Sequence, residues 1–180
     1  MQVVSSHPRR VFLVGPMGVG KTTIGKLIAR ELDLEFIDCD QEIERRCGAD
    51  IPWIFDVEGE DGFRARETSV LDDLTGQDGL LVATGGGAVI RKENRGFLKT
   101  RGIVIYLDSD VDLLVKRTAN DKKRPLLQNN DPKQVLTRIK QERGPLYREV
   151  ADVHIMVPDD GSRKAANLVM QQLQKEGFVE

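Results

Sequence analysis

Apolar positions along the chain fall into two patterns, short continuous runs and stripes at helical spacing. The runs predict strands at 11–14, 35–37, 80–83, 103–107 and 153–157. The stripes predict helices at about 21–32, 51–57, 63–74, 92–99, 110–119, 132–143 and 162–175, together with a polar helix that Gly48 ends. Strands that alternate with helices predict an α/β fold in which one parallel sheet is covered on both faces.

Composition and charge narrow the class of protein. The chain has 180 residues and no internal repeat or low-complexity linker, which predicts a single domain over 1–180. A formal net charge of −2 argues against nucleic acid or an anionic membrane as a partner. The sequence contains no run of about 18 apolar residues, so no membrane span is predicted. Residues 1–10 lack the apolar stretch of a secretory signal. Cys39 and Cys47 form no C-x-x-C motif, so we expect free thiols in a reducing cytoplasm.

The most specific motif is a glycine loop between the first strand and the first helix. Residues 15–22 read G-P-M-G-V-G-K-T, which matches the phosphate-loop pattern G-x-x-x-x-G-K-[ST] in its required strand–loop–helix context. Lys21 supplies a cation for the β- and γ-phosphates, and the Thr22 hydroxyl suits Mg²⁺. The predicted nucleoside triphosphate contacts are Gly18, Val19, Gly20, Lys21, Thr22 and Thr23.

Acidic residues follow the second predicted strand. Asp38 and Asp40 come at its carboxyl end, beside the loop after the first strand, and alternation along an extended backbone would point both side chains the same way. One carboxylate could hold Mg²⁺ through water, and the other could accept a hydrogen bond from a substrate hydroxyl. The alternative is that Asp40 only caps a helix.

Two further motifs allow either a functional or a purely structural interpretation. Arg64 and Glu67, spaced i, i+3 on one helix, would form a rigid fork for a carboxylate or phosphate, or a solvated surface pair. The triplet 85–87, Gly85-Gly86-Gly87, follows a buried strand and would let the backbone approach a ligand closely, or form a flexible turn.

Two arginines also need an explanation. Arg124 lies in the polar stretch 120–131, which has no core-forming pattern, and could close over phosphates or simply be solvated. Arg143 precedes Gly144-Pro145 and is expected to end a helix, where a cation is favourable for the helix dipole alone.

Taken together, the motifs resemble the shikimate kinase family over nearly the whole chain. The residues that carry the resemblance are Gly15–Thr23, Phe36–Asp40, Gly62–Arg64 with Glu67, Ala83–Gly87, Lys123–Leu127 and Arg143–Tyr147. It implies a three-layer phosphate-loop kinase fold like that of the nucleoside monophosphate kinases, with a five-stranded parallel sheet, a substrate-binding segment (about 38–67) and a lid (about 120–131). It also implies Mg²⁺-dependent transfer of the ATP γ-phosphate to the 3-hydroxyl of shikimate, within chorismate and aromatic amino-acid biosynthesis.

The resemblance assigns expected roles residue by residue. Lys21, Asp40 and Arg124 would act in catalysis, Asp40 by binding substrate hydroxyls and taking the proton of the attacking one, and Thr22 and Asp38 would hold Mg²⁺. The residues expected to bind shikimate are Asp40, Arg64, Glu67, Gly85, Gly86, Gly87 and Arg143. Arg117 would lie along the adenine, and Arg124 would lie over the transferring phosphate.

One departure and several alternatives stay open. Some family members place a proline opposite the adenine arginine; the loop 158–163 leaves that second wall open, with Asp160 as the nearest candidate. The rivals are another small-molecule kinase, such as a gluconate kinase, and a GTP-dependent switch, for which no Asn-Lys-x-Asp motif is present. The resemblance implies a cytoplasmic monomer that uses ATP and Mg²⁺ and binds neither nucleic acid nor membrane.

Overall fold

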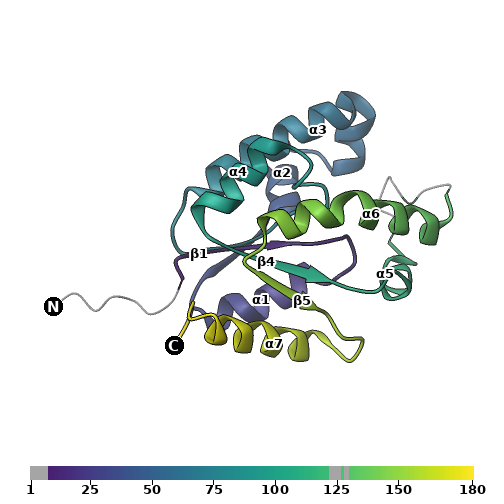
Figure 1. Ribbon diagram of the computed structural model, residues 1–180. Coiled ribbons are helices and arrows are strands. Elements are labelled where there is room, and N and C mark those ends of the chain that lie inside the picture. The colour runs from purple at the N-terminus through teal and green to yellow at the C-terminus, as the bar shows by residue number, and fades with distance from the viewer. Residues whose placement is uncertain (1–7, 122–126, 128–129) are drawn as a thin grey trace.

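The molecule is built on one five-stranded sheet. The computed structural model describes residues 8–121, 127 and 130–180. All strand pairs are parallel, in the order β2-β3-β1-β4-β5 (Figure 1). The strands are β1 (Arg10–Val14), β2 (Glu35–Asp38), β3 (Leu80–Ala83), β4 (Ile103–Asp108) and β5 (Val153–Met156).

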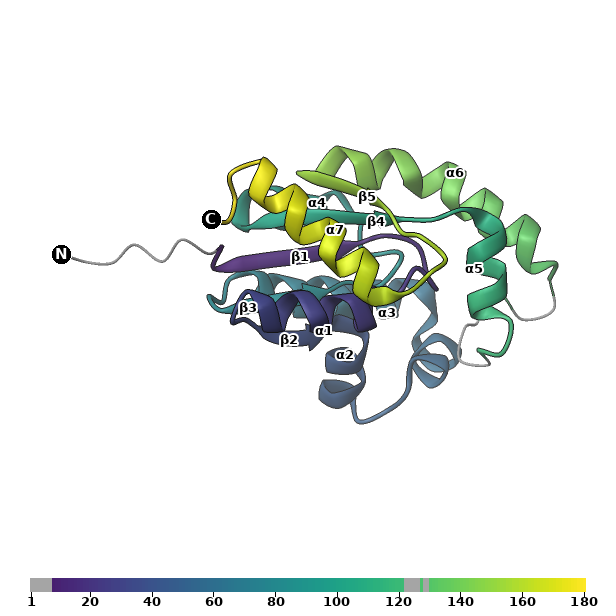
Figure 2. The same ribbon diagram turned by 90° about the horizontal axis from the view of Figure 1, so that it is seen from below.

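Helices cover both faces of this sheet, as the alternating pattern predicts. On one face lie α1 (Lys21–Glu31) and α7 (Ser162–Lys175), which pack side by side (Figure 2). The opposite face carries α2 (Cys39–Cys47), α3 (Ile51–Thr75), α4 (Lys92–Arg101) and α6 (Pro132–Val150), while α5 (Val111–Thr118) lies near the end of the sheet (Figure 1). The described part of the chain therefore forms the expected three layers.

The apolar runs are the buried strands. All four residues of β3 are buried, and β1 is buried from Val11 onward, because helices exclude water from both faces. Successive side chains of a strand point to opposite faces of the sheet. They pack into two apolar clusters, one beneath α1 and α7 and one beneath α3 and α4. Each leucine or isoleucine buried in this way contributes roughly 1.5–3 kcal/mol, which holds the carboxyl edge of the sheet in place.

The order of the strands in the sheet differs from their order in the chain. β3 lies between β1 and β2 and pairs with both, yet Asp38 lies beside the loop after β1, as expected. Chain order cannot reveal such a crossover, since a helical connection spans one strand as easily as none. The carboxyl ends of β1, β2 and β3 still meet at one edge, where ligands bind in parallel sheets.

One prediction about a helix is confirmed by the structure and another is wrong. The predicted separation of helices 51–57 and 63–74 is confirmed: they belong to the two helical pieces of α3, which meet at Gly59, where φ is 72°. The predicted end of α6 at Arg143 is wrong, because the helix continues to Val150 with Pro145 inside it. Burial of Tyr147 and Val150 on the continued face outweighs the hydrogen bond that proline removes.

Three remaining points concern the expected lid, Trp53 and the prediction of no membrane span. Much of the expected lid, about 120–131, lies outside the described residues, as does Arg124. Trp53 is half exposed on α3, at the edge of a surface hollow beside Cys47. Among the helices of the described ranges, none has the length and apolar character needed to cross a bilayer.

Candidate active site

The glycine loop leaves β1 and enters α1 in a conformation built for an anion. Gly20, directly before α1, has φ 103°, and a side chain on Gly15 would collide with the carbonyl oxygen of Leu107. No side chain caps the first turn of α1, and no acidic residue lies in it. The first backbone N–H groups of the helix and its positive dipole end therefore face the mouth of the loop.

Lys21 and Thr22 both point into this mouth. The Lys21 Nζ atom donates to the carbonyl oxygens of Gly15 and Pro16 at 2.7 and 2.9 Å. The Thr22 hydroxyl donates to Asp38 Oδ2 at 2.8 Å, which joins the first turn of α1 to the end of β2. The acidic residue after the second strand therefore lies beside the phosphate loop, as predicted.

Asp38 and Asp40 reach the cleft by a route other than the one expected. Asp38 is the N-cap of α2, where its Oδ1 accepts from the Gln41 N–H at 3.1 Å, and Asp40 lies in the first turn of that helix. The argument from strand alternation is wrong, because the extended backbone ends at Asp38. Both residues nevertheless line the same cleft as Lys21 and Thr22.

The glycine triplet is where the remaining predicted side chains meet. A Cβ atom added to Gly85 would lie 2.7 Å from Asp40 Oδ1 and 3.0 Å from Glu67 Oε2. One added to Gly87 would lie 2.6 Å from the Cζ atom of Arg64, and one on Gly86 would come within 3.7 Å of Arg143 Nη1. Glycine is required here by close approach, which decides against a merely flexible turn.

Arg64, Glu67 and Arg143 form the enclosed floor beside this triplet. Arg64 is 7% exposed, Glu67 0% and Arg143 8%, and Arg64 Nη1 donates to Glu67 Oε1 at 2.8 Å. A solvated surface pair is therefore excluded, and so is a purely dipolar role for Arg143, because α6 does not end there. The Nε atom of Arg64 and Oε2 of Glu67 are buried without a hydrogen-bond partner among the described residues, as expected where a ligand completes the set.

Burial also affects the proton affinity of this floor. Desolvation raises the pKa of Glu67, while Arg64 and then Arg143 oppose the rise. Two buried guanidinium groups face one fully buried carboxylate, Glu67, because the carboxylate of Glu60, 3.5 Å from Arg64 Nη2, is largely exposed and compensates only weakly. An anionic ligand group bound here would restore the balance, which favours a carboxylate or phosphate.

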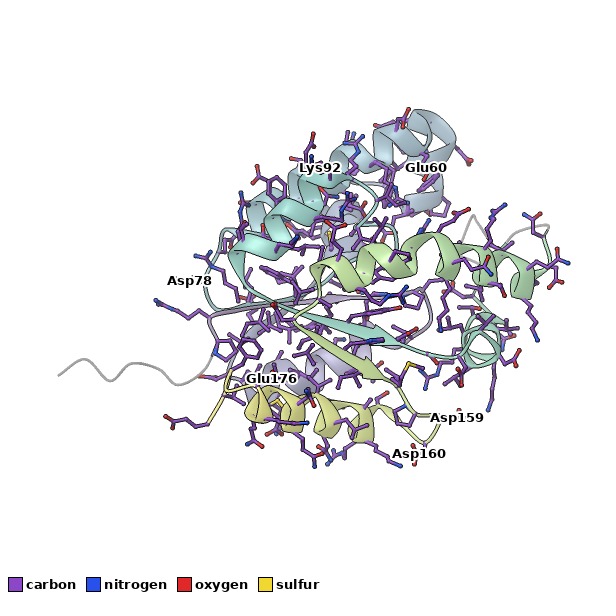
Figure 3. The ribbon with its side chains drawn as sticks, viewed as in Figure 1. Glu60, Asp78, Lys92, Asp159, Asp160 and Glu176 are labelled. Atoms are coloured by element: carbon purple, nitrogen blue, oxygen red, sulfur yellow. The ribbon has the colours of Figure 1, made fainter. Side chains whose placement is uncertain are left out.

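Of the two predicted adenine contacts, Arg117 lines the cleft and Asp160 does not. Arg117 lines the cleft and donates to the carbonyl oxygens of Val19 and Pro158 at 2.9 and 3.4 Å. Asp160 is not among the cleft residues; it lies on the loop before α7 (Figure 3), where its carboxylate pairs with Lys164 at 2.5 Å. The structure therefore brings Arg117 to the loop that precedes α7 through Pro158.

The oxygen ligands present fit magnesium. Thr22 and Asp38 offer a hydroxyl and a carboxylate at hydrogen-bonding distance from each other, which are the hard oxygen donors that Mg²⁺ prefers. The described residues contain no cluster of three or more acidic, histidine or cysteine side chains able to hold a metal by themselves. That pattern suits a cation shared between protein, water and phosphate oxygens.

Three residues near the triplet were missed by sequence reasoning. The Tyr147 hydroxyl donates to the Gly86 carbonyl oxygen, and Asn94 Nδ2 donates to Ala88 O at 2.9 Å. Arg95 donates to the carbonyl oxygens of Val89 and Ile90 at 2.8 and 2.9 Å. The only available signal was the presence of Tyr147 in the motif that Arg143 begins.

A phosphate loop at the edge of a parallel sheet, facing a buried pair of arginines, defines the class: a phosphate-loop phosphotransferase that acts on a small anionic acceptor. The family model described as shikimate kinase matches residues 17–174. The shikimate kinase of Alteromonas mediterranea is 56% identical over 168 residues, which cover 93% of this chain and 98% of that protein. The chain belongs to the shikimate kinase family and is an ATP-dependent kinase that uses Mg²⁺.

Further comparisons agree with this assignment. The shikimate kinase of Vibrio cholerae (strain O395) is 52% identical over 94% of this chain and 98% of that protein. The structure of the Acinetobacter baumannii shikimate kinase in complex with shikimate has a TM-score of 0.92 and 50% identity, covering 96% of each chain. A gluconokinase from Sinorhizobium meliloti, at 14% identity and a TM-score of 0.57 over 94% of each chain, shares the fold alone.

Proposed function

We propose that the floor formed by Arg64, Glu67 and Arg143 binds the carboxylate of shikimate and holds its 3-hydroxyl toward ATP. The reaction of the family is transfer of the ATP γ-phosphate to that hydroxyl, within chorismate and aromatic amino-acid biosynthesis. The observation that carries the proposal is the enclosure of both arginines against the glycine triplet, beside Asp40. A neutral polyol would bring no anion to the two buried guanidinium groups, and Arg64 would keep only its bonds to Glu67 and Glu60.

On the acceptor side, each residue has a distinct task. The guanidinium of Arg64, held in place by Glu67, forms a fork for the two carboxylate oxygens, and Arg143 approaches the same group from α6. Asp40 accepts hydrogen bonds from substrate hydroxyls and takes the proton of the attacking one. Gly85, Gly86 and Gly87 let the substrate lie against the backbone, with the N–H of Gly86 as a donor.

On the nucleotide side, the task is alignment and neutralisation of charge. Backbone N–H groups of Gly18, Val19, Gly20, Lys21, Thr22 and Thr23 surround the phosphates, and the Lys21 ammonium leaves its loop carbonyls for phosphate oxygens. Thr22 would hold Mg²⁺ directly and Asp38 through water, and the cation supplies charge neutralisation on the phosphate oxygens.

Several assignments remain part of the proposal. Arg117 lies along the adenine and Asp160 is the candidate for its second wall, with Pro158 the residue that contacts Arg117. Arg124, in a lid at about 120–131, lies over the transferring phosphate. We propose one domain over 1–180, with a substrate-binding segment at about 38–67.

The decisive experiment separates the carboxylate fork from other roles of Arg64. Arg64→Lys keeps a cation beside Glu67 but loses the planar fork, so kcat/KM for shikimate should fall about 30-fold or more. The matched control is Arg66→Lys two residues further on, where an exposed arginine pairs with Glu58; its kcat/KM should stay within about twofold of the parent.

The same pair of enzymes is then assayed with shikimate methyl ester, which lacks the carboxylate charge. The parent should use the ester poorly, and Arg64→Lys should lose little further, because the interaction has already been removed from the substrate. Equal losses on acid and ester would overturn the fork. Turnover of gluconate in preference to shikimate would replace the proposal with the rival kinase.

We also propose a monomer in the cytoplasm. Both cysteines are free thiols, Cys39 buried and Cys47 partly so, which suits a reducing compartment. Burial raises the pKa of the Cys39 thiol, and Glu67 and Asp40 raise it further. Sedimentation at micromolar concentration measures the oligomeric state.

A further inference from the structure

Tyr147 is a buried phenol that the phosphoryl transfer itself does not use. It lies one turn after Arg143 on α6, is 1% exposed, and donates its hydroxyl hydrogen to the carbonyl oxygen of Gly86. We propose that Tyr147 is a positioning residue. Its hydroxyl fixes the peptide between Gly86 and Gly87 in the orientation that receives shikimate. This inference rests on the proposed function and assigns the residue that sets the geometry of the acceptor site.

The triplet needs such a partner because glycine does not set its own backbone angles. The Gly85 carbonyl accepts from the N–H of Ala88 at 3.1 Å, and that of Gly87 accepts from Ile90 at 3.1 Å. Both are turn bonds within the segment itself. In the part of the chain that the structure describes, the middle carbonyl is held by the phenol of Tyr147, the one side chain that bonds a carbonyl of the triplet.

Because the peptide bond is planar and trans, the hydrogen bond from Tyr147 fixes the orientation of the peptide between Gly86 and Gly87. The C=O of Gly86 and the N–H of Gly87 point in opposite directions, so drawing the carbonyl toward α6 turns the N–H away from it. It also limits ψ of Gly86 and so the path of the backbone where a Gly86 side chain would meet Arg143 and a Gly87 side chain would meet Arg64. Tyr147 thus sets the spacing between the backbone and both guanidinium groups.

The phenol is itself held rigidly. Its ring packs against Tyr106 of β4, with ring centroids 5.0 Å apart and planes at 31°. Tyr106 stacks in turn on His154 at 4.4 Å. Since Arg143 and Tyr147 occupy successive turns of α6, this helix fixes the carboxylate contact and the glycine backbone together.

The phenol stays a donor over the working range of pH. Burial raises the pKa of Tyr147 to about 12, against the lowering effect of Arg143 and Arg64 and with a further rise from Glu67. These groups come from α6 itself and from α3, and Tyr106 faces the ring from β4. Loss of the hydrogen bond by ionisation therefore requires strongly alkaline conditions.

The first test uses the two neighbouring tyrosines, Tyr147 and Tyr106, as a matched pair. Tyr147→Phe removes only the hydroxyl, so KM for shikimate should rise about three- to tenfold while KM for ATP stays unchanged. Tyr106→Phe also removes one buried hydroxyl, which interacts with Asp108 and not with the glycine triplet, and should leave both KM values unchanged. Equal KM values for shikimate in Tyr147→Phe and the parent would overturn the inference, as would a parallel change in KM for ATP.

The second test keeps the fold and changes only the acidity of the phenol. The chain has two tyrosines, so a ring-fluorinated tyrosine supplied during expression of Tyr106→Phe is confined to position 147. Fluorine lowers the phenol pKa, so the rise in KM for shikimate should move to lower pH than in unlabelled Tyr106→Phe. A coincident pH profile in the two preparations would contradict a donor role.

The parent enzyme separates this inference from the proposed function. If the parent fails to phosphorylate shikimate, the proposed function fails, and the positioning role fails with it. If the parent turns shikimate over while Tyr147→Phe is unaltered, the positioning role alone is wrong.

Discussion

At Gly87 the backbone passes so close to the Arg64 guanidinium that no side chain fits between them. Three atoms of the guanidinium would crowd an added Cβ: Nη2 most closely, and Cζ and Nη1 at 2.6 Å each. The neighbour is the charged end of a buried side chain paired with Glu67, which has little room to retreat. A single methyl group at this position therefore tests the geometry of the whole acceptor site.

Gly87→Ala should displace the guanidinium and lower kcat/KM for shikimate by about 10²-fold, the usual consequence of a misplacement near 1 Å. KM for ATP should change little, since the phosphate loop lies on another strand end. Steady-state kinetics with each substrate varied in turn measures both.

The control is Gly96→Ala on α4, where no atom lies within 4 Å of the added carbon. That change should leave activity intact and stabilise the helix by about 0.5–1 kcal/mol in urea unfolding. Loss of activity in both variants would point to a general loss of fold.

Single residues also show what sequence can predict. The pattern placed Lys21, Thr22, Asp38 and Asp40 at one cleft, because motif spacing and strand ends specify the edge of a sheet. It could not assign Tyr147, since its contact with Gly86 joins positions 61 residues apart and leaves no local pattern.

Among the elements, α2 and α3 form a charged unit around Glu42. Its carboxylate accepts from Arg45 at 2.8 Å and from Arg46 at 2.7 Å, and Arg46 reaches Asp73 of α3 at 2.6 Å. These hydrogen bonds lower the pKa of Glu42 to about 2. The network links the predicted substrate-binding segment to the second half of α3.

Glu42→Gln should therefore make stability less dependent on pH. The folded-state pKa lies below the ordinary value of 4.5, so the stabilisation is full above that value and is lost as pH falls toward 2. Near neutral pH the variant should lose about 0.5–1 kcal/mol of unfolding free energy, less in high salt.

Urea unfolding of parent and variant at a series of pH values checks this prediction. The two curves should converge in acid. Glu31→Gln on α1 is the control: Glu31 is an exposed carboxylate for which the described residues show no ion pair, and the substitution should leave the pH dependence unchanged. A difference between parent and Glu42→Gln that persists at pH 2 would contradict the cause assigned.

Helix α6 shows why element boundaries are harder to predict than elements. Gly144-Pro145 is an ordinary stop signal, and the sequence-based end at Arg143 followed it. The helix continues because Tyr147 and Val150 bury apolar surface beyond the proline. Tertiary packing of this kind has no trace in a local window.

For the molecule as a whole, the proposed acceptor site is assembled from separate elements. Asp40 comes from α2, Arg64 from α3, Gly86 from the loop after β3 and Arg143 from α6. A ligand that touches all four binds only the folded chain. Its affinity is therefore added to the stability of the fold.

Shikimate at about 100 times its Kd should raise the unfolding free energy by about 2.7 kcal/mol, which corresponds to about 5–10 °C in Tm for a chain of this size. Gluconate at the same concentration should give no shift, because it belongs to the rival assignment. Thermal unfolding followed by circular dichroism measures both. Equal shifts from the two acids would contradict selective binding.

The layered α/β architecture could be predicted from alternating apolar runs and stripes, whereas the strand order could not. Placing β3 between β1 and β2 depends on where each crossover helix packs, which is a property of the assembled core. The resemblance added the phosphate-loop kinase type of this fold, and the structure showed which strands are neighbours.

The strand order also decides what the rim of the sheet offers to other molecules. Its two outermost strands, β2 and β5, are each four residues long, and Glu35 on the first and His154 on the second are exposed to solvent. Although Met156 on β5 is also exposed, edge strands this short are a poor template for edge-to-edge growth between copies. Concentrated solutions should therefore stay dispersed instead of joining into continuous β-structure.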